Sequence, residues 1–288
     1  MLKITRLGLA AGLIIALGMG YNSNAQGLKT PAPSPTQTLK QNFALGEITI
    51  EYSRPSVKGR TIFGDLVPFG KVWRTGANGA TKVTFTEDMK VEGKDLKAGT
   101  YALYTIPGKE SWDVMFYKDL TMGGNVDDYK VENEVLKVNV KPMAVANKVE
   151  TFTIDVAEVM PKTATIELVW DNTKVGIKVS ADIDSKIMKN IETTMAKDAR
   201  PYGQAAGYYY DNDKDMNQAL TWVNKALEQN PKAYWNMMLK ANIEYKLKNY
   251  TAATASAEKT IAMATEDKDD SYVNKAKKLL ADTKAAKK

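Results

Sequence analysis

The residues most capable of chemistry lie in one loop-rich segment, residues 52–81. Five basic side chains stand there beside a single carboxylate, Asp65: they are Arg54, Lys58, Arg60, Lys71 and Arg74. If these groups converge, they suit a small anion such as a carboxylate, sulfate or phosphate, or a carbohydrate. The candidate ligand-binding residues are Arg54, Lys58, Arg60, Asp65, Arg74 and Asn78.

Two other interpretations of this segment stay open. In one, the arginines only brace the loop, by donating hydrogen bonds to backbone carbonyls and carboxylates across a sheet. In the other, the chain is a histidine-free hydrolase or transferase with Asp65 as acid or base. Arg54, Arg60 and Arg74 would then hold the charge of the transition state, with Asn78 as a neutral donor. The enzyme interpretation requires these groups to share one pocket with a second carboxylate.

The composition excludes several kinds of site. The 288 residues include no cysteine and no histidine, which excludes disulfides, thiol nucleophiles, Cys/His zinc sites and Ser-His-Asp triads. We expect no metal and no cofactor, because the phosphate-loop and dinucleotide-binding glycine motifs are also missing. Residues 26–183 carry 20 basic and 20 acidic side chains, and residues 184–288 carry 18 and 14. Neither balance suits a nucleic-acid partner.

The first 25 residues have the pattern of a secretory signal peptide. Lys3 and Arg6 precede an apolar run from Leu7 to Met19, and small or polar residues follow as far as Ala25. The apolar run is shorter than the about 20 residues that a membrane-spanning helix needs. The sequence therefore predicts cleavage after Ala25, a periplasmic or extracellular location, and no membrane span in the mature chain. Residues 26–37 are proline-rich and predict a flexible lead-in.

Hydrophobic residues then alternate with polar ones, which is the period of β-strands. The pattern predicts strands at 48–52, 83–85, 101–106, 112–117, 136–140, 152–156, 165–170 and 174–179. Asp171 and Asn172 tolerate positive φ, so the last two strands should form a hairpin. Because no helical period intervenes, residues 38–182 are expected to form an antiparallel β-sandwich or flattened barrel, with Trp73 in its core.

The period changes to that of an α-helix near Asp184. Ile183, Ile187, Ile191 and Met195 recur at four-residue spacing, which predicts a helix running towards Arg200. Asp184 is expected to cap its first turn. The fold class that follows is a β domain and then an all-α domain, residues 183–288.

The helical part resembles a short tetratricopeptide-like solenoid over residues 200–267. In a 34-residue window from Arg200, five residues fall at the consensus positions: Gly207, Tyr210, Ala219, Ala226 and Pro231. The next window, from Tyr234, keeps the pattern less well, and a plain stack of helical hairpins is the alternative. A lysine-rich helix from 272 to about 286 suits a solenoid end. The resemblance implies a protein partner, with Tyr208–Tyr210 either as anchors or as packing residues.

Residues 52–81, together with two motifs later in the β half, resemble the exported bacterial family known as domain of unknown function 2911. The motifs that carry this resemblance are Ser53-Arg54-Pro55, Lys58-Gly59-Arg60, Ile62-Phe63-Gly64, Val72-Trp73-Arg74-Thr75-Gly76-Ala77-Asn78, Ala98-Gly99-Thr100-Tyr101-Ala102-Leu103 and Ile106-Pro107-Gly108. The resemblance implies a β-rich domain to about residue 180, sometimes followed by helical repeats, with no established activity. Where members often carry a Trp-Gly pair, this chain has Met122-Gly123-Gly124.

The sequence thus favours an exported binding or scaffold protein. Its helical repeats would engage a protein partner, and its β domain would offer a small anion or carbohydrate site. The alternative is the histidine-free hydrolase or transferase around Asp65, Arg54, Arg60 and Arg74.

Overall fold

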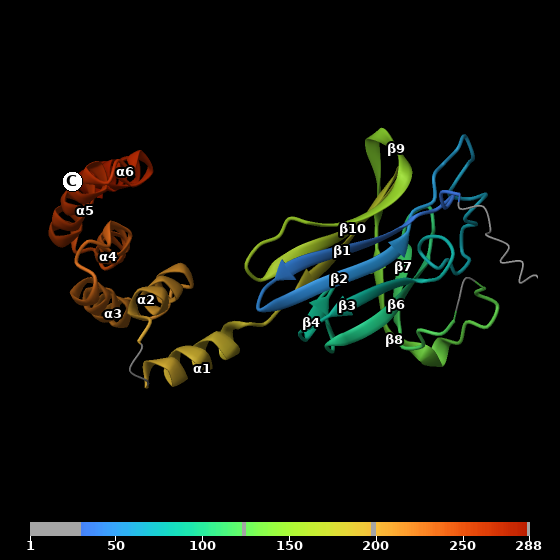
Figure 1. Cartoon of the computed structure of the whole chain (residues 1–288), viewed down its shortest axis with the longest axis horizontal. Helices are drawn as coiled ribbons and strands as arrows, with labels where there is room; N and C mark the ends of the chain where they lie inside the picture. The colour runs from blue at the N-terminus through green and yellow to red at the C-terminus, as the bar shows by residue number, and fades with distance from the viewer. Residues whose placement is uncertain (1–29, 123–124, 197–199, 287–288) are drawn as a thin grey trace, which may run out of the picture.

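Two antiparallel sheets followed by helices make up the molecule (Figure 1). The computed structural model describes residues 30–122, 125–196 and 200–286. The predicted signal peptide, residues 1–25, lies outside these residues, as do residues 26–29 of the predicted lead-in.

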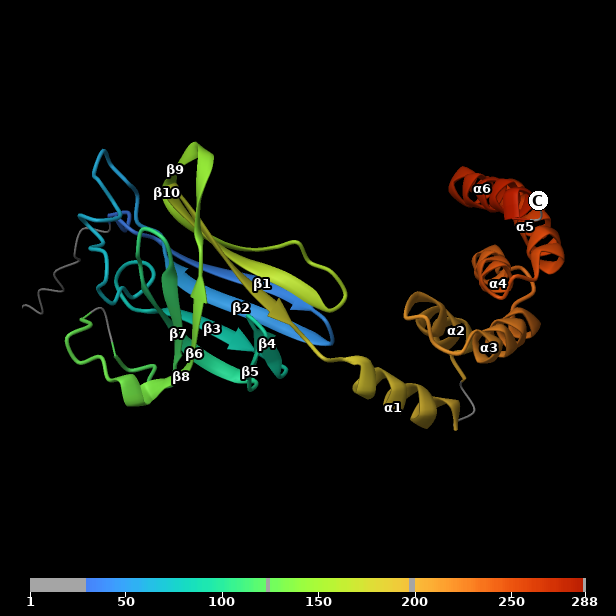
Figure 2. The same ribbon diagram turned by 180° about the vertical axis from the view of Figure 1, so that it is seen from behind.

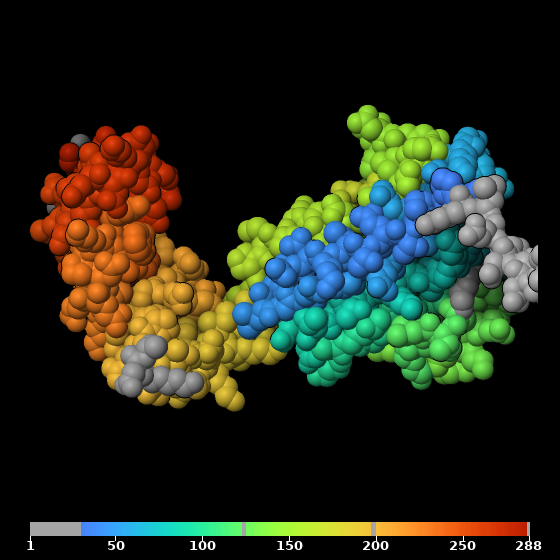
Figure 3. All heavy atoms as spheres, viewed as in Figure 1, coloured from blue at the N-terminus to red at the C-terminus, as the bar shows by residue number. Residues whose placement is uncertain are grey.

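The first sheet has six strands in the order β1-β2-β3-β6-β7-β8. They are β1 (Thr36–Phe43), β2 (Gly46–Ser53), β3 (Thr81–Phe85), β6 (Gly99–Ile106), β7 (Trp112–Tyr117) and β8 (Glu134–Val140). Every neighbouring pair in this sheet is antiparallel. The surface view shows β1 and β2, in blue, uncovered on one face of the β part (Figure 3).

The second sheet has the order β5-β4-β10-β9. Its strands are β4 (Met89–Val91), β5 (Lys94–Leu96), β9 (Pro142–Ala157) and β10 (Thr163–Ser180). Strand β10 turns back on itself at Asp171, whose φ is 53°. Lys174 Nζ lies 2.8 Å from Glu167 Oε1, whereas seven residues of straight strand would separate them by about 23 Å. The predicted hairpin at Asp171 is therefore confirmed.

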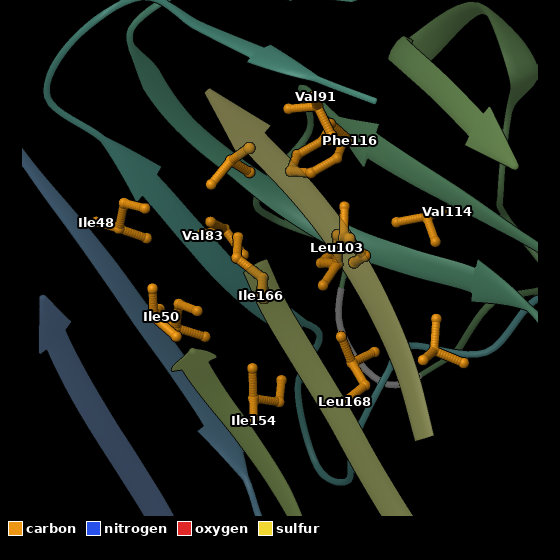
Figure 4. Packing of buried hydrophobic residues seen from close by; sticks show 14 of the residues in the cluster. Ile48, Ile50, Val83, Val91, Leu103, Val114, Phe116, Ile154, Ile166 and Leu168 are labelled. Carbon is orange, nitrogen blue, oxygen red and sulfur yellow. The ribbon is translucent and has the colours of Figure 1, made fainter. Parts of the chain in front are cut away.

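The core lies between the two sheets, so this domain is a sandwich, and the barrel alternative is wrong because the sheets do not close on each other. Figure 4 shows Ile48, Ile50 and Leu103 of the first sheet facing Ile154 and Ile166 of the second. All five side chains are at most 2% exposed. They occupy alternate strand positions, as the period of two predicted.

Three β-strands differ from the sequence expectation. Strand β1 begins at Thr36, inside the stretch that was expected to be a flexible lead-in as far as residue 37. It lies at the edge of its sheet, and of its eight residues only Phe43 is fully buried, so its hydrophobic signal is weak. Strands β4 and β5 are three residues each and flank the turn at Gly93.

Six α-helices follow in the part of the chain that the structure describes, and the first begins where the sequence period was expected to change, near Asp184. They are α1 (Asp184–Met195), α2 (Tyr202–Asp211), α3 (Met216–Gln229), α4 (Tyr234–Lys246), α5 (Tyr250–Glu266) and α6 (Asp270–Ala286). Within the described β part, the helical structure is one 3₁₀ turn, η1 (Val131–Asn133). Helix α1 ends at Met195 rather than near Arg200.

The predicted role of Asp184 as a helix cap is wrong. It is the first residue of α1, and its carboxylate accepts hydrogen bonds from elsewhere: from the Tyr208 hydroxyl, and from Lys214 Nζ at 2.9 Å. These donors lower the pKa of Asp184, since both favour its charged form. The sequence pattern could not show this, because both partners lie beyond the helix that Asp184 begins.

The helices pack through small residues. Ala206, Ala219 and Val223 of α2 and α3 meet Ile243 of α4 in one cluster, and the next cluster joins α4, α5 and α6. Helix α4 therefore lies between α2 and α6. Viewed from the two sides in Figures 1 and 2, α2–α6 lie apart from both sheets. In the described part of the chain, no helix is long and apolar enough to cross a membrane.

Candidate functional site

The segment between β2 and β3 crosses from the first sheet to the second. Phe152 N donates a hydrogen bond to Pro55 O, and Val57 N donates one to Glu150 O, both at 2.8 Å. These bonds lay residues 55–57 along the outer edge of β9. The segment therefore closes one open side of the sandwich and satisfies backbone groups that an edge strand would otherwise expose.

Arg54 spans the same seam with its side chain. Its Nε donates to Phe152 O at 3.1 Å and its Nη2 donates to Thr153 Oγ1 at 2.8 Å. The guanidinium is thus fixed between the two sheets by a carbonyl and a hydroxyl. This arrangement is the bracing interpretation that the sequence left open.

Arg60 braces its own loop in the same way. Its Nε donates to Val57 O at 3.0 Å and its Nη2 donates to Ser56 O at 2.6 Å. The neighbouring Lys58 is exposed, and so is Asp65. These hydrogen bonds of Arg54 and Arg60 therefore serve the loop and the sheet rather than a ligand.

Replacing Arg54 by methionine should lower the free energy of unfolding by about 1.5–3 kcal/mol, because hydrogen bonds from a charged donor are lost and a part-buried carbonyl is left without that donor. Urea unfolding of the purified protein measures this. Arg60→Met, whose side chain is exposed, is the matched control and should cost less. If Arg54→Met leaves stability unchanged, Arg54 does not brace the sandwich.

Arg74 belongs to a different surface, the outward face of the first sheet. Its charge acts on the Tyr104 hydroxyl, where it partly offsets the increase in pKa that burial causes. Tyr104 alternates along β6 with Leu103, which faces the core. The Tyr104 ring meets Tyr117 with centroids 5.2 Å apart, and Tyr117 stacks on Tyr129 at 4.8 Å. A second, smaller core therefore forms outside the sandwich, where Met122, Val126 and Tyr129 pack on this face.

The tyrosine cluster predicts a loss of stability in alkali. Burial raises the pKa of Tyr104 from 10.0 to about 12, and burial, then the hydrogen bond to Glu134, raises that of Tyr129 further. Above pH 10 the unfolded chain releases these protons while the folded chain keeps them, so unfolding becomes easier. By pH 11, Tyr104 alone should cost about 1 kcal/mol.

Urea unfolding at pH 9 and pH 11 checks this prediction. Tyr104→Phe should reduce the difference between the two pH values, and Tyr129→Phe should reduce it too. Equal dependence on pH in the parent protein and both variants would contradict the assignment.

Asn78 lies at a small pocket beside β1 and β2. Its Nδ2 is 3.2 Å from both Ser53 Oγ and Ser34 O, to which it donates. The pocket has a volume of about 270 Å³, and its lining includes Glu51 and Lys82. It could hold only a small polar molecule.

The contacts described above place five of the six candidate residues in three separate groups, and the sixth, Asp65, is exposed on the loop. Arg54, Lys58 and Arg60 follow the seam along β9. Arg74 acts on Tyr104, and Asn78 lines the small pocket. The hydrogen bonds described above join no member of one group to a member of another.

The sandwich and its seam coincide with a known family. Residues 34–179 match the family described as Protein of unknown function (DUF2911). The chain belongs to this family. No curated protein and no solved structure matches this chain. The match ends at residue 179, before helix α1 begins at Asp184, so it does not cover the helices.

A further candidate site lies in the helical part, at a place the sequence did not suggest. The α2–α4 groove has a volume of about 460 Å³ and is formed by Arg200, Pro201, Tyr202, Gly203, Gln204, Ala226, Gln229, Asn230, Trp235 and Asn236. Trp235 is 47% exposed, which is unusual for so large an apolar side chain.

The tyrosines that the sequence offered as anchors are used for packing instead. Tyr208 donates to Asp184, and the Tyr209 ring meets Trp222 at 4.7 Å. Tyr210 is half-buried against the α2–α4 cluster. The packing alternative for Tyr208–Tyr210 is therefore the one that the structure shows.

Proposed function

We propose that this DUF2911 protein is a binding protein that holds a polypeptide partner in the α2–α4 groove. The observation that carries the proposal is Trp235, an exposed tryptophan inside a groove. Tryptophan is enriched among the few residues that dominate the binding energy of protein interfaces, because it buries a large rigid surface on contact. A partner that covers Trp235 would remove its exposed apolar surface from water, which would stabilise the complex.

The rest of the lining suits a peptide backbone. Gln204, Gln229, Asn230 and Asn236 surround Trp235, and each amide offers both donors and an acceptor. A peptide group presents one donor and one acceptor, so an extended segment can pair with such amides along its length. Gly203 adds space, because a Cβ there would lie 2.8 Å from Asn236 Oδ1.

The basic residues at the α2–α4 groove favour a partner segment with acidic side chains. Arg200 lines the groove, and Lys225 Nζ lies 5.4 Å from the ring centroid of Tyr202, which also lines it. In this proposal the helices are two tetratricopeptide-like repeats with α6 as the cap. The protein acts after export, as the signal-peptide pattern of residues 1–25 suggests. The DUF2911 domain serves as the scaffold that carries the repeats.

The hydrolase alternative gains no support from the geometry. It requires Arg54 and Arg60 to hold developing charge, but both donate to backbone carbonyls. Asp65, its proposed acid or base, is exposed.

Selection from a random peptide library displayed on phage tests the proposal. The purified protein should enrich a family of peptides rich in acidic residues, and Trp235→Ala should not enrich them. Lys259→Ala, an exposed residue of α5 outside the groove, is the control and should enrich the same family. Failure of the parent protein to enrich any peptide, or equal enrichment by Trp235→Ala, would contradict the proposal.

A further inference from the structure

A pocket of the DUF2911 domain lies on the outward face of the second sheet. Its volume is about 780 Å³, within the range of small-molecule sites. Thr165 and Lys178 stand on the two arms of β10, at positions that alternate with core-facing residues. The turn between β4 and β5 supplies Glu92, and the connection from β9 to β10 supplies Glu158 and Met160.

Both carboxylates at this pocket are held in place by the sheet. Glu92 Oε1 accepts a hydrogen bond from Lys178 N at 2.6 Å, and Glu158 Oε2 accepts one from Thr165 Oγ1 at 3.1 Å. Each bond engages one of the two oxygens of its carboxylate. The side chains are therefore oriented without the help of a cationic partner in these bonds.

The remaining lining is hydroxyl-bearing and apolar. Thr165 and Ser180 supply hydroxyl groups, and Met160, which is 60% exposed, supplies an apolar surface at the pocket. With Lys178 as the only cationic side chain among the described lining residues, two carboxylates leave a net negative charge. A ligand that matches this lining has a positive charge on an apolar stem.

We propose that this pocket binds aliphatic amines, with the ammonium group at Glu92 and Glu158 and the hydrocarbon stem against Met160. The volume, the fixed carboxylates and the exposed thioether carry the assignment together. The pocket lies in the β domain and the α2–α4 groove in the helices, so this inference does not depend on the proposed peptide binding.

Two probes of equal length separate charge from shape. Cadaverine (pentane-1,5-diamine) carries ammonium groups where pentane-1,5-diol carries neutral hydroxyls. In isothermal titration at neutral pH, cadaverine should bind the full protein and the diol should bind at least about tenfold more weakly. Saturation-transfer NMR with each probe at about 10 mM detects binding too weak for calorimetry.

Substitutions then locate the site. Glu92→Gln and Glu158→Gln keep an acceptor oxygen for Lys178 N and Thr165, so the fold is retained, and each should weaken cadaverine binding at least about fivefold. Lys178→Met removes a like charge and should strengthen it. Glu110→Gln, an exposed acid outside the pocket, is the control.

The proposal is overturned by any of three results. They are no cadaverine binding at about 10 mM, equal binding of the diamine and the diol, or binding that neither glutamine variant weakens more than Glu110→Gln does.

Discussion

Replacing Trp73 by alanine should lower the free energy of unfolding of the DUF2911 domain by about 3–5 kcal/mol, the cost of removing a large buried aromatic side chain. Trp73 is 8% exposed, and its ring lies 5.3 Å from Phe152 and 5.9 Å from Trp170 of the opposite sheet. Its Nε1 donates to Gly76 O at 3.0 Å. Its ring also lies 6.3 Å from that of Trp112 in the first sheet, so the residue links the 52–81 segment to both sheets.

A domain with a total stability of about 5–15 kcal/mol would lose much of it through this one change. Urea unfolding followed by tryptophan fluorescence measures the effect. Trp73→Phe keeps an aromatic ring but loses the bond to Gly76 O, so it should cost clearly less. A cost for Trp73→Ala below about 1 kcal/mol would mean that the aromatic cluster does not hold the segment in place.

Replacing Trp235 by alanine should have the opposite profile: a large loss of binding with little loss of stability. Central tryptophans of interfaces contribute at least about 2 kcal/mol, so the affinity for a selected peptide should fall at least about 30-fold. Trp235 is already 47% exposed in the free protein, so its truncation removes few stabilising contacts. Fluorescence anisotropy of a labelled peptide and thermal unfolding measure the two quantities separately.

The control is again Lys259→Ala, which should change neither quantity. Trp235→Phe should recover part of the affinity, because a smaller aromatic ring still fills the groove. If Trp235→Ala unfolds the helical part, or if the affinity is unchanged while the protein remains folded, Trp235 is not a binding anchor.

The sequence predicted the architecture wherever a regular period was present. The alternation at Ile48 and Ile50 and the four-residue spacing of Ile183 and Ile187 are properties of local chain geometry, and both were confirmed. The edge strand β1 was not predicted as a strand. Its outward positions are polar and its inward positions, apart from Phe43, are only half-buried, so the alternation carries little hydrophobic contrast.

The candidate site was less predictable, because its contacts join residues distant in sequence. Arg54 binds the carbonyl of Phe152, 98 positions away, and residue types alone cannot distinguish that bond from one to a ligand. Trp235 was not among the candidate residues of the sequence. Only the arrangement of α2 beside α4 shows that a groove leaves its ring exposed.

Chemical-shift mapping with a selected peptide tests the central claim most directly. In a ¹⁵N-labelled sample, we predict that the peptide shifts the Trp235 indole and the side-chain amides of Gln204 and Asn236, and leaves the DUF2911 domain unchanged. Shifts concentrated in residues 34–179, with the Trp235 indole unmoved, would contradict the claim that the α2–α4 groove is the binding surface of this protein.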